Sequence, residues 1–184
     1  LSLIVPSGMI SKKNRTSTQI SPAMKKLLAS LFFVFTTLFT YGQQFHVASY
    51  NVRYANPADE QRGNGWSQRC PVICNQIAYE SFDLVGMQEV LKSQFDDLSN
   101  RLSRDYGCIG VGRNDGKTSG EYAPIFYKKD RFILLDSGCF WLSETPDKPS
   151  VGWDAKYPRI CSWAQLQDRN TGNTLYFLNT HFDH

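Results

Sequence analysis

The sequence predicts a single α/β domain in which helices cover one face of a β-sheet. Near its start, apolar runs of strand length alternate with segments of helical periodicity. From residue 106 onward, most apolar runs have the length of a strand and are flanked by turn-forming residues. With 41% hydrophobic and 20% charged residues in a chain of 184, the composition indicates one globular core. A sheet with helices on one face must pack its other face on something else.

The first 42 residues are set apart from this domain. Residues 1–23 do not begin with Met and show no clear periodicity, so we interpret them as an upstream extension without a fold. Residues 24–42 have the layout of a signal peptide, in which two lysines precede the apolar stretch 27–40 and residues 41–43 resemble a cleavage site. That stretch is short for a membrane span. We expect export to the periplasm or beyond and no stable span after processing, with a retained signal anchor as the alternative.

The charge of the chain gives no strong signal of nucleic-acid binding. The leader holds five of the twenty Lys and Arg residues and none of the seventeen Asp and Glu residues. Residues 43–184 therefore carry fifteen basic and seventeen acidic residues, a formal charge of −2, although the whole chain is at +3. A protein adapted to nucleic acid keeps its positive charge after processing. All five cysteines also lie in this part, and their odd number and spacing favour buried thiols over disulfides or a zinc site.

The first half of the domain is expected to contain two strands, each followed by a helix. Phe45–Val52 alternates like a strand, and the polar segment Pro57–Gly65 is expected to be a loop. A helix is predicted over Trp66–Ser81, with Pro71 in its early turns. Asp83–Met87 suits a buried strand. The amphipathic helix that follows is marked by apolar residues at helical spacing, namely Leu91, Phe95, Leu98 and Leu102.

The second half is expected to consist mainly of strands. Tyr106–Val111 is the first, and Pro124 argues that the run Tyr122–Tyr127 is an edge strand or contains a bulge. A third strand covers Arg131–Leu142, before a long loop of the kind that often carries function. The last two strands, Ile160–Gln167 and Thr174–Asn179, are joined by a hairpin signal, Asn170-Thr171-Gly172-Asn173.

Two polar residues follow predicted strands in the first half. Glu89 comes directly after a buried run, where α/β proteins collect their ligands, and a single Glu can hold Mg²⁺ because that ion keeps several waters. Alternatively, Glu89 stabilises the start of the next helix through its dipole. The amide of Asn51 could orient a phosphate or a metal-bound water, or it could close a turn.

The end of the chain concentrates further ionisable groups. His181 and His184 flank Asp183, and an imidazolium can neutralise charge on a phosphoryl group or protonate a leaving oxygen. A zinc site using the two histidines is the competing interpretation. The loop at residues 110–118 resembles a Walker A motif, but its spacing is wrong, so Arg113 either contacts a substrate phosphate or is solvated. An aromatic set could line a sugar or base platform or pack in the core: Trp141, Trp153, Tyr157 and Trp163.

Taken together, these segments resemble the endonuclease/exonuclease/phosphatase superfamily, the DNase-I-like metal-dependent phosphodiesterases. The resemblance is carried by Ser49-Tyr50-Asn51-Val52-Arg53, Gln88-Glu89, Gly120-Glu121-Tyr122, Ile125-Phe126-Tyr127 and Asn179-Thr180-His181. Residues 140–146 and 152–154 are similar to a secreted bacterial subgroup. The similarity covers about residues 45–184, and the order of the motifs makes it specific.

The resemblance implies a four-layer α/β/β/α sandwich, of which residues 43–184 would be a partial domain, truncated after the first half. It implies that Glu89 binds Mg²⁺ or Mn²⁺, that Asn51 helps to place the metal or the phosphate, and that His181 contacts the scissile phosphate. Substrate contacts would come from Arg113, Tyr127 and Asn179. We expect a phosphoester hydrolase that is inactive as this chain alone, because the family's later motifs are missing. The alternative is a secreted glycan- or ligand-binding module with a degenerate catalytic set.

Overall fold

The structure is a computed structural model that describes residues 21–37 and 44–183. The chain divides into two compact units, Leu1–Gln43 and Gln44–His184. In the first, helix α1 spans Pro22–Thr37. Among the helices of the described ranges, none has both the length and the apolar character needed to cross a bilayer. The predicted upstream extension and the predicted cleavage site lie largely outside the described residues.

The first sheet of the second unit has four strands in the order β1-β2-β4-β3. Strands β1 (Val47–Asn51) and β2 (Leu84–Gln88) are parallel, and β4 (Ile125–Lys128) runs antiparallel to β2 and to β3 (Tyr106–Ile109). All five residues of β2 are buried, as expected for a strand covered on both faces. The predicted strands of this region are confirmed, with shifts of a few residues at their ends.

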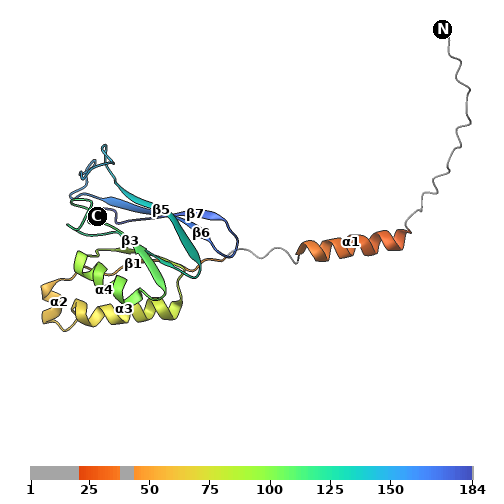
Figure 1. Cartoon of the computed structure of the whole chain (residues 1–184), viewed down its shortest axis with the longest axis horizontal. Coiled ribbons are helices and arrows are strands. Elements are labelled where there is room, and N and C mark those ends of the chain that lie inside the picture. Colours follow the sequence, from red (N-terminus) through yellow and green to blue (C-terminus); the bar gives the residue numbers. More distant parts are fainter. Residues whose placement is uncertain (1–20, 38–43, 184) are drawn as a thin grey trace, which may run out of the picture. The chain divides into compact units, whose positions relative to one another are not determined.

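Helices α3 (Trp66–Glu80) and α4 (Lys92–Leu102) cover one face of this sheet (Figure 1). Their apolar stripes bury Ile77 and Leu98 completely against Val85 and Phe126 of the sheet. Pro71 lies inside α3 rather than at its start. Because proline has no N–H, the helix loses one hydrogen bond in its second turn, which its buried face offsets.

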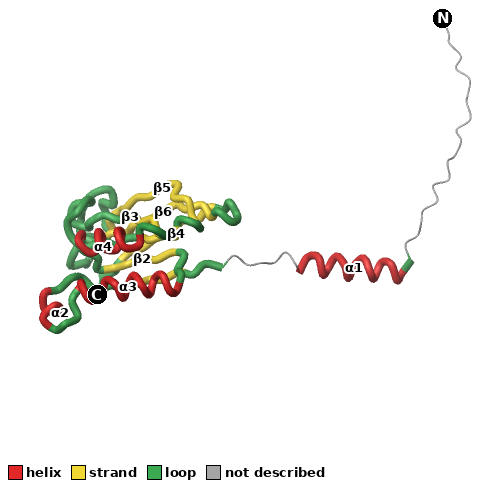
Figure 2. Tube along the Cα trace, turned by 60° about the horizontal axis from the view of Figure 1, so that its bottom comes forward, coloured by secondary structure: helices red, strands yellow, loops and turns green. Residues whose placement is uncertain are grey.

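The second sheet packs on the other face of the first. It consists of β5 (Phe132–Trp141), β6 (Ile160–Asp168) and β7 (Thr174–Thr180), all antiparallel, with β6 in the centre. The predicted hairpin between β6 and β7 is confirmed. The core between the two sheets contains Leu84, Ile125, Phe132, Ala164 and Leu166. Figure 2 shows the strands of the two sheets gathered together, with α3 running alongside them.

The described part of the domain therefore has three layers: helices, a mixed sheet and an antiparallel sheet. The outer face of the antiparallel sheet exposes Leu135, Tyr176 and Leu178. The mixed α/β class with a two-sheet core is confirmed. The fourth layer that the resemblance implies is not among the described residues.

Two expectations about local structure were wrong. The segment expected to be a polar loop contains a short helix, α2 (Pro57–Gln61), whose start is capped by the side chain of Asn56 accepting a hydrogen bond from Ala58 N. An Asn followed by a Pro at the first helical position is a recognised start signal. Pro124 was expected to mark an edge strand or a bulge, and the edge alternative is wrong because β4 lies between β2 and β3. The proline is tolerated because the strand begins one residue after it.

One buried side chain joins the two sheets. The amide nitrogen of Asn179, on β7, donates hydrogen bonds to the carbonyl oxygens of Met87 (2.7 Å) and Pro124 (3.0 Å). Its oxygen accepts a hydrogen bond from Gln88 Nε2 at 2.9 Å. Gly86 makes this approach feasible, because a Cβ atom there would lie 2.6 Å from Asn179 Oδ1. The link fixes the end of β7 relative to the end of β2.

Candidate active site

Asn51 and Glu89 meet at one edge of the first sheet. Strands β1 and β2 are parallel, and their register pairs Asn51 with Gln88, so both chains leave the sheet at the same edge. Asn51 Nδ2 donates a hydrogen bond of 2.8 Å to Glu89 Oε1. The interpretation of Asn51 as a residue that only closes a turn is therefore incomplete, because its amide also orients the carboxylate.

The backbone is strained at this edge. Arg53 has φ of 58° and Glu89 has φ of 61°, both in the left-handed region that non-glycine residues rarely adopt. Each such residue costs on the order of 1 kcal/mol, and such strain is concentrated at functional sites. In this conformation Tyr54 N donates a hydrogen bond to Glu89 Oε2 (3.1 Å), and Arg53 N donates one to Asn51 Oδ1 (2.9 Å).

Two further side chains hold the loop after β1. Gln94, fully buried on α4, accepts a hydrogen bond from Ala55 N at 2.9 Å and donates one to Arg53 O at 3.0 Å. Arg69, on α3, donates to the carbonyl oxygens of Val52, Arg53 and Tyr54. The roles of Gln94 and Arg69 could not be predicted from the sequence, because nothing in their local pattern distinguishes them from other polar helix positions.

These contacts keep Glu89 ionised. Partial burial of the carboxylate favours the neutral form, but the hydrogen bonds from Asn51 and from Tyr54 N, with the nearby His181 and Arg53, outweigh it. The pKa of Glu89 therefore lies below its ordinary value. A carboxylate that stays charged at neutral pH is suited to binding a cation.

The donor set fits a single-carboxylate Mg²⁺ site. Each Glu89 oxygen accepts one hydrogen bond from the protein, which leaves lone pairs free, and Mg²⁺ commonly takes only one or two protein ligands. Asn51 fits less well as a ligand, because its oxygen already accepts the bond from Arg53 N. Within residues 21–37 and 44–183 there is no group of three or more His, Cys, Asp and Glu side chains placed to hold a metal.

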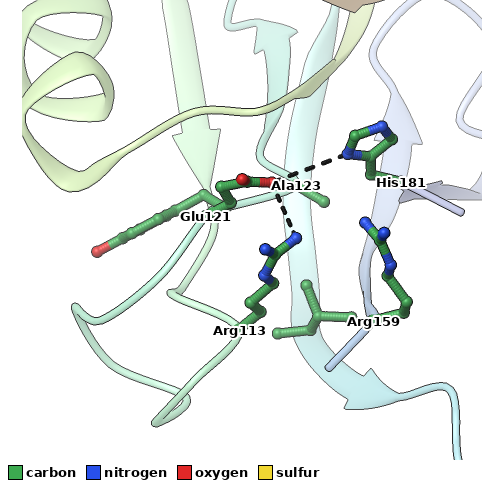
Figure 3. Close-up of a pocket in the computed structure, with 7 residues that line it drawn as sticks. Arg113, Glu121, Ala123, Arg159 and His181 are labelled. Carbon is green, nitrogen blue, oxygen red and sulfur yellow. Dashed lines mark hydrogen bonds and ion pairs between the residues drawn. The ribbon is translucent and has the colours of Figure 1, made fainter. Parts of the chain in front are cut away.

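Glu89 lines a pocket, and most of the other residues that line it come from the second half of the chain. It has a volume of about 370 Å³ and is lined by Tyr54, Glu89, Arg113, Glu121, Tyr157, Arg159 and His181. Glu121 lies between two cationic or basic groups, Arg113 Nη1 at 2.8 Å and His181 Nδ1 at 3.9 Å (Figure 3). Arg159 lies beside His181 in the same view.

Among the described residues, three buried side-chain nitrogen atoms at this pocket make no hydrogen bond within the protein. They are Arg113 Nε, Arg159 Nε and His181 Nδ1, and all three residues line the small cavity behind the pocket. Buried donors are normally satisfied, and exceptions occur where a ligand or water completes the site. This side of the pocket therefore offers donors to an anion or a water.

Asp183 fastens this side of the pocket. Its carboxylate pairs with Arg159 and accepts a hydrogen bond from Lys156 N at 2.7 Å. The second histidine of the motif, His184, lies outside the described residues, so the zinc interpretation is not tested by the structure.

The structure brings four of the six predicted site residues together. Glu89, His181 and Arg113 line one pocket, and Asn51 contacts Glu89. Arg113 is therefore not a solvated loop residue, since its side chain pairs with Glu121. The other two predicted substrate contacts lie elsewhere. Asn179 is buried in the link between the sheets, and Tyr127 packs in the core between them.

The predicted aromatic platform separates into different environments. Trp141 is buried and donates from Nε1 to Arg113 O at 2.7 Å. Trp163 packs near Tyr176 in the second sheet, with ring centroids 6.3 Å apart. Only Tyr157 of this set lines the pocket that contains Glu89.

A mixed sheet packed on an antiparallel sheet, with a carboxylate and an imidazole lining one pocket, defines an α/β protein with a two-sheet core and a polar site at its edge. No family model matches the chain. An endonuclease/exonuclease/phosphatase family protein from Bacteroides thetaiotaomicron is 51% identical with a TM-score of 0.73, over 75% of this chain and 51% of that one. A mannosyl-6-phosphatase of the same species is 50% identical with a TM-score of 0.74, over 77% of this chain and 52% of that one.

A more distant structure, of humanized Danio rerio TDP2, shares the fold at 20% identity and a TM-score of 0.54. The identity of about 50% to the Bacteroides proteins shows that the chain is a member of the endonuclease/exonuclease/phosphatase superfamily. It spans about half the length of the Bacteroides proteins that it matches.

Proposed function

We propose that this chain forms half of a metal-dependent phosphoester hydrolase, whose remaining half supplies the fourth layer of the sandwich. The observation that carries the proposal is that Glu89, at the end of one sheet, and His181, at the end of the other, line a single pocket. Its lining alternates carboxylates with cationic donors, as binding a metal and a phosphate side by side requires.

Three residues of the pocket, Glu89, His181 and Arg113, would each have a defined task. Glu89, kept ionised by Asn51, would hold Mg²⁺ or Mn²⁺, and the bound cation would act as a Lewis acid on the phosphoryl oxygens. His181 would donate a hydrogen bond to the scissile phosphate and so stabilise the charge that develops on it. Arg113, held by Glu121, would add a second cationic donor.

The first substrates to test are sugar phosphates. The similarity to a mannosyl-6-phosphatase over 77% of this chain supports this choice, although the fold by itself does not select a substrate. The formal charge of −2 on residues 43–184 argues against a long polyanion such as DNA.

The test is hydrolysis by the full-length protein that contains this chain. Sugar phosphates, glycerol phosphate, DNA and RNA are compared with Mg²⁺ and with chelator. We expect Mg²⁺-dependent release of phosphate that falls at least about 100-fold in Glu89→Gln and in His181→Asn. Matched controls make the same substitutions away from the pocket, at Glu80 on α3 and at His46. Retention of full activity in Glu89→Gln would rule the proposal out.

A binding module is the rival, and one observation favours it. Trp153, on the loop between β5 and β6, is 73% exposed and has φ of 50°, so the backbone is strained to present an aromatic ring to solvent. A binding module would bind unphosphorylated glycans with the same affinity as their phosphate esters, and it would hydrolyse none of the esters.

We also propose that residues 24–42 direct export. The order of basic and apolar residues supports this, and so does the helical conformation of Pro22–Thr37. N-terminal sequencing of the protein from the producing cells should find a start near residue 43. A start at Met24 would favour the signal anchor.

A further inference from the structure

We propose that Tyr157 determines which phosphate esters the pocket accepts, by stacking on a sugar ring in the alcohol part of the substrate. The inference rests on the proposed function, because it concerns the same pocket. It goes further, because it assigns the recognition of the alcohol to one residue and predicts discrimination between cyclic and acyclic alcohols.

The loop that carries Tyr157 is fastened on both sides of it. Lys156 N donates to Asp183 Oδ2 at 2.7 Å, and Arg159 pairs with the same carboxylate. Farther along, Leu142 N donates to Arg159 O at 2.8 Å, which closes the loop at its base. Tyr157 is therefore held in place even though 44% of its surface is exposed. An exposed aromatic ring with a fixed position can bind a ligand at low cost in conformational entropy.

The orientation of the ring is also set by its neighbours. The guanidinium carbon of Arg113 lies 5.4 Å from the centroid of the Tyr157 ring, and Arg113 is itself held by Glu121 at 2.8 Å. Lys156 Nζ lies 5.5 Å from the same centroid, but Lys156 is exposed. Its flexible side chain can move aside for a ligand ring, whereas the paired Arg113 cannot.

The surroundings of Tyr157 suit a sugar. A pocket of about 370 Å³ lies at the small end of the range for ligand sites, enough for a phosphate and one ring. The C–H groups of a sugar ring pack well on the electron-rich face of an aromatic side chain. The hydroxyl groups need acceptors nearby, and the carboxylate of Glu121 lines the same pocket. An acyclic alcohol such as glycerol would gain little from the aromatic face.

The experiment measures binding to the full-length protein, with Ca²⁺ in place of Mg²⁺ to slow turnover. The probes are glucose 6-phosphate, glycerol 3-phosphate and adenosine 5′-monophosphate, and the variants are Tyr157→Ala and Tyr157→Phe. Tyr79→Ala is the matched control, because Tyr79 is an exposed tyrosine on α3 that does not line this pocket. Far-ultraviolet circular dichroism checks that every variant is folded.

We expect Tyr157→Ala to weaken glucose 6-phosphate binding about tenfold, the effect of losing one stacking contact, while glycerol 3-phosphate binding is unchanged. Tyr157→Phe and Tyr79→Ala should bind all probes like the unaltered protein. The inference is overturned if Tyr157→Ala affects both phosphates equally or neither, or if only the nucleotide depends on Tyr157. Absence of hydrolysis alongside the expected binding pattern would instead refute the proposed function and leave this inference standing.

Discussion

Replacing Asn179 by Ala should destabilise the protein by about 3 kcal/mol. The side chain is only 7% exposed and makes three hydrogen bonds, two from its nitrogen to carbonyl oxygens and one to its oxygen from Gln88. Each such bond contributes about 1 kcal/mol net. Two of the three partners left behind are not orphaned, since Gln88 Nε2 keeps Ser49 Oγ at 3.2 Å and Pro124 O keeps Met87 N at 3.0 Å. The sum of about 3 kcal/mol therefore includes no desolvation penalty for these two groups.

Urea unfolding of the full-length protein measures this loss. With a slope of about 2 kcal/mol per molar, the midpoint of unfolding should fall by about 1.5 M. The matched control is Asn173→Ala, the same change at an exposed position in the β6–β7 turn, which should alter stability by less than about 0.5 kcal/mol. A loss below about 1 kcal/mol in Asn179→Ala, together with abolished substrate binding, would show that Asn179 acts as a substrate contact and would refute the structural role.

Three further predictions concern single contacts. Asn51→Ala should raise the pKa of Glu89 in an NMR titration. In the unaltered protein, ionised Glu89 contributes stability that is present above about pH 4.3 and is lost as the pH falls through its lowered pKa. An unchanged pKa of Glu89 in Asn51→Ala would contradict the role of Asn51. Cys74, whose pKa burial raises to about 12, should resist iodoacetamide at pH 8 until urea unfolds the protein, and rapid native labelling would contradict its burial. Gly86→Ala should destabilise the protein, and less so in the Asn179→Ala background, because the added Cβ meets Asn179 at 2.6 Å; equal costs in both backgrounds would exclude that clash.

Much of the site's first half could be predicted from the sequence. Glu89 follows an apolar run and Asn51 ends another, and two strands each followed by a helix predict parallel neighbours that end at one edge. Their contact then follows from local pattern and a general rule of chain connection. The role of Asn179 could not be predicted in this way. It depends on how closely β7 approaches β2, which Gly86 permits.

The opposite wall of the pocket was decided by tertiary structure. Glu121 lies between Arg113 and His181 only because the two sheets pack face to face and bring the end of β7 over the loop that follows β3. The position of Tyr157 depends likewise on Asp183, from the far end of the chain. Periodicity and turn signals encode contacts between near neighbours in sequence. The sequence alone therefore determined the class of fold and the edge of the sheet at which Asn51 and Glu89 meet. The packing of one sheet on the other decided which charged groups face that edge, because burial and distance between remote segments are set only when the core closes.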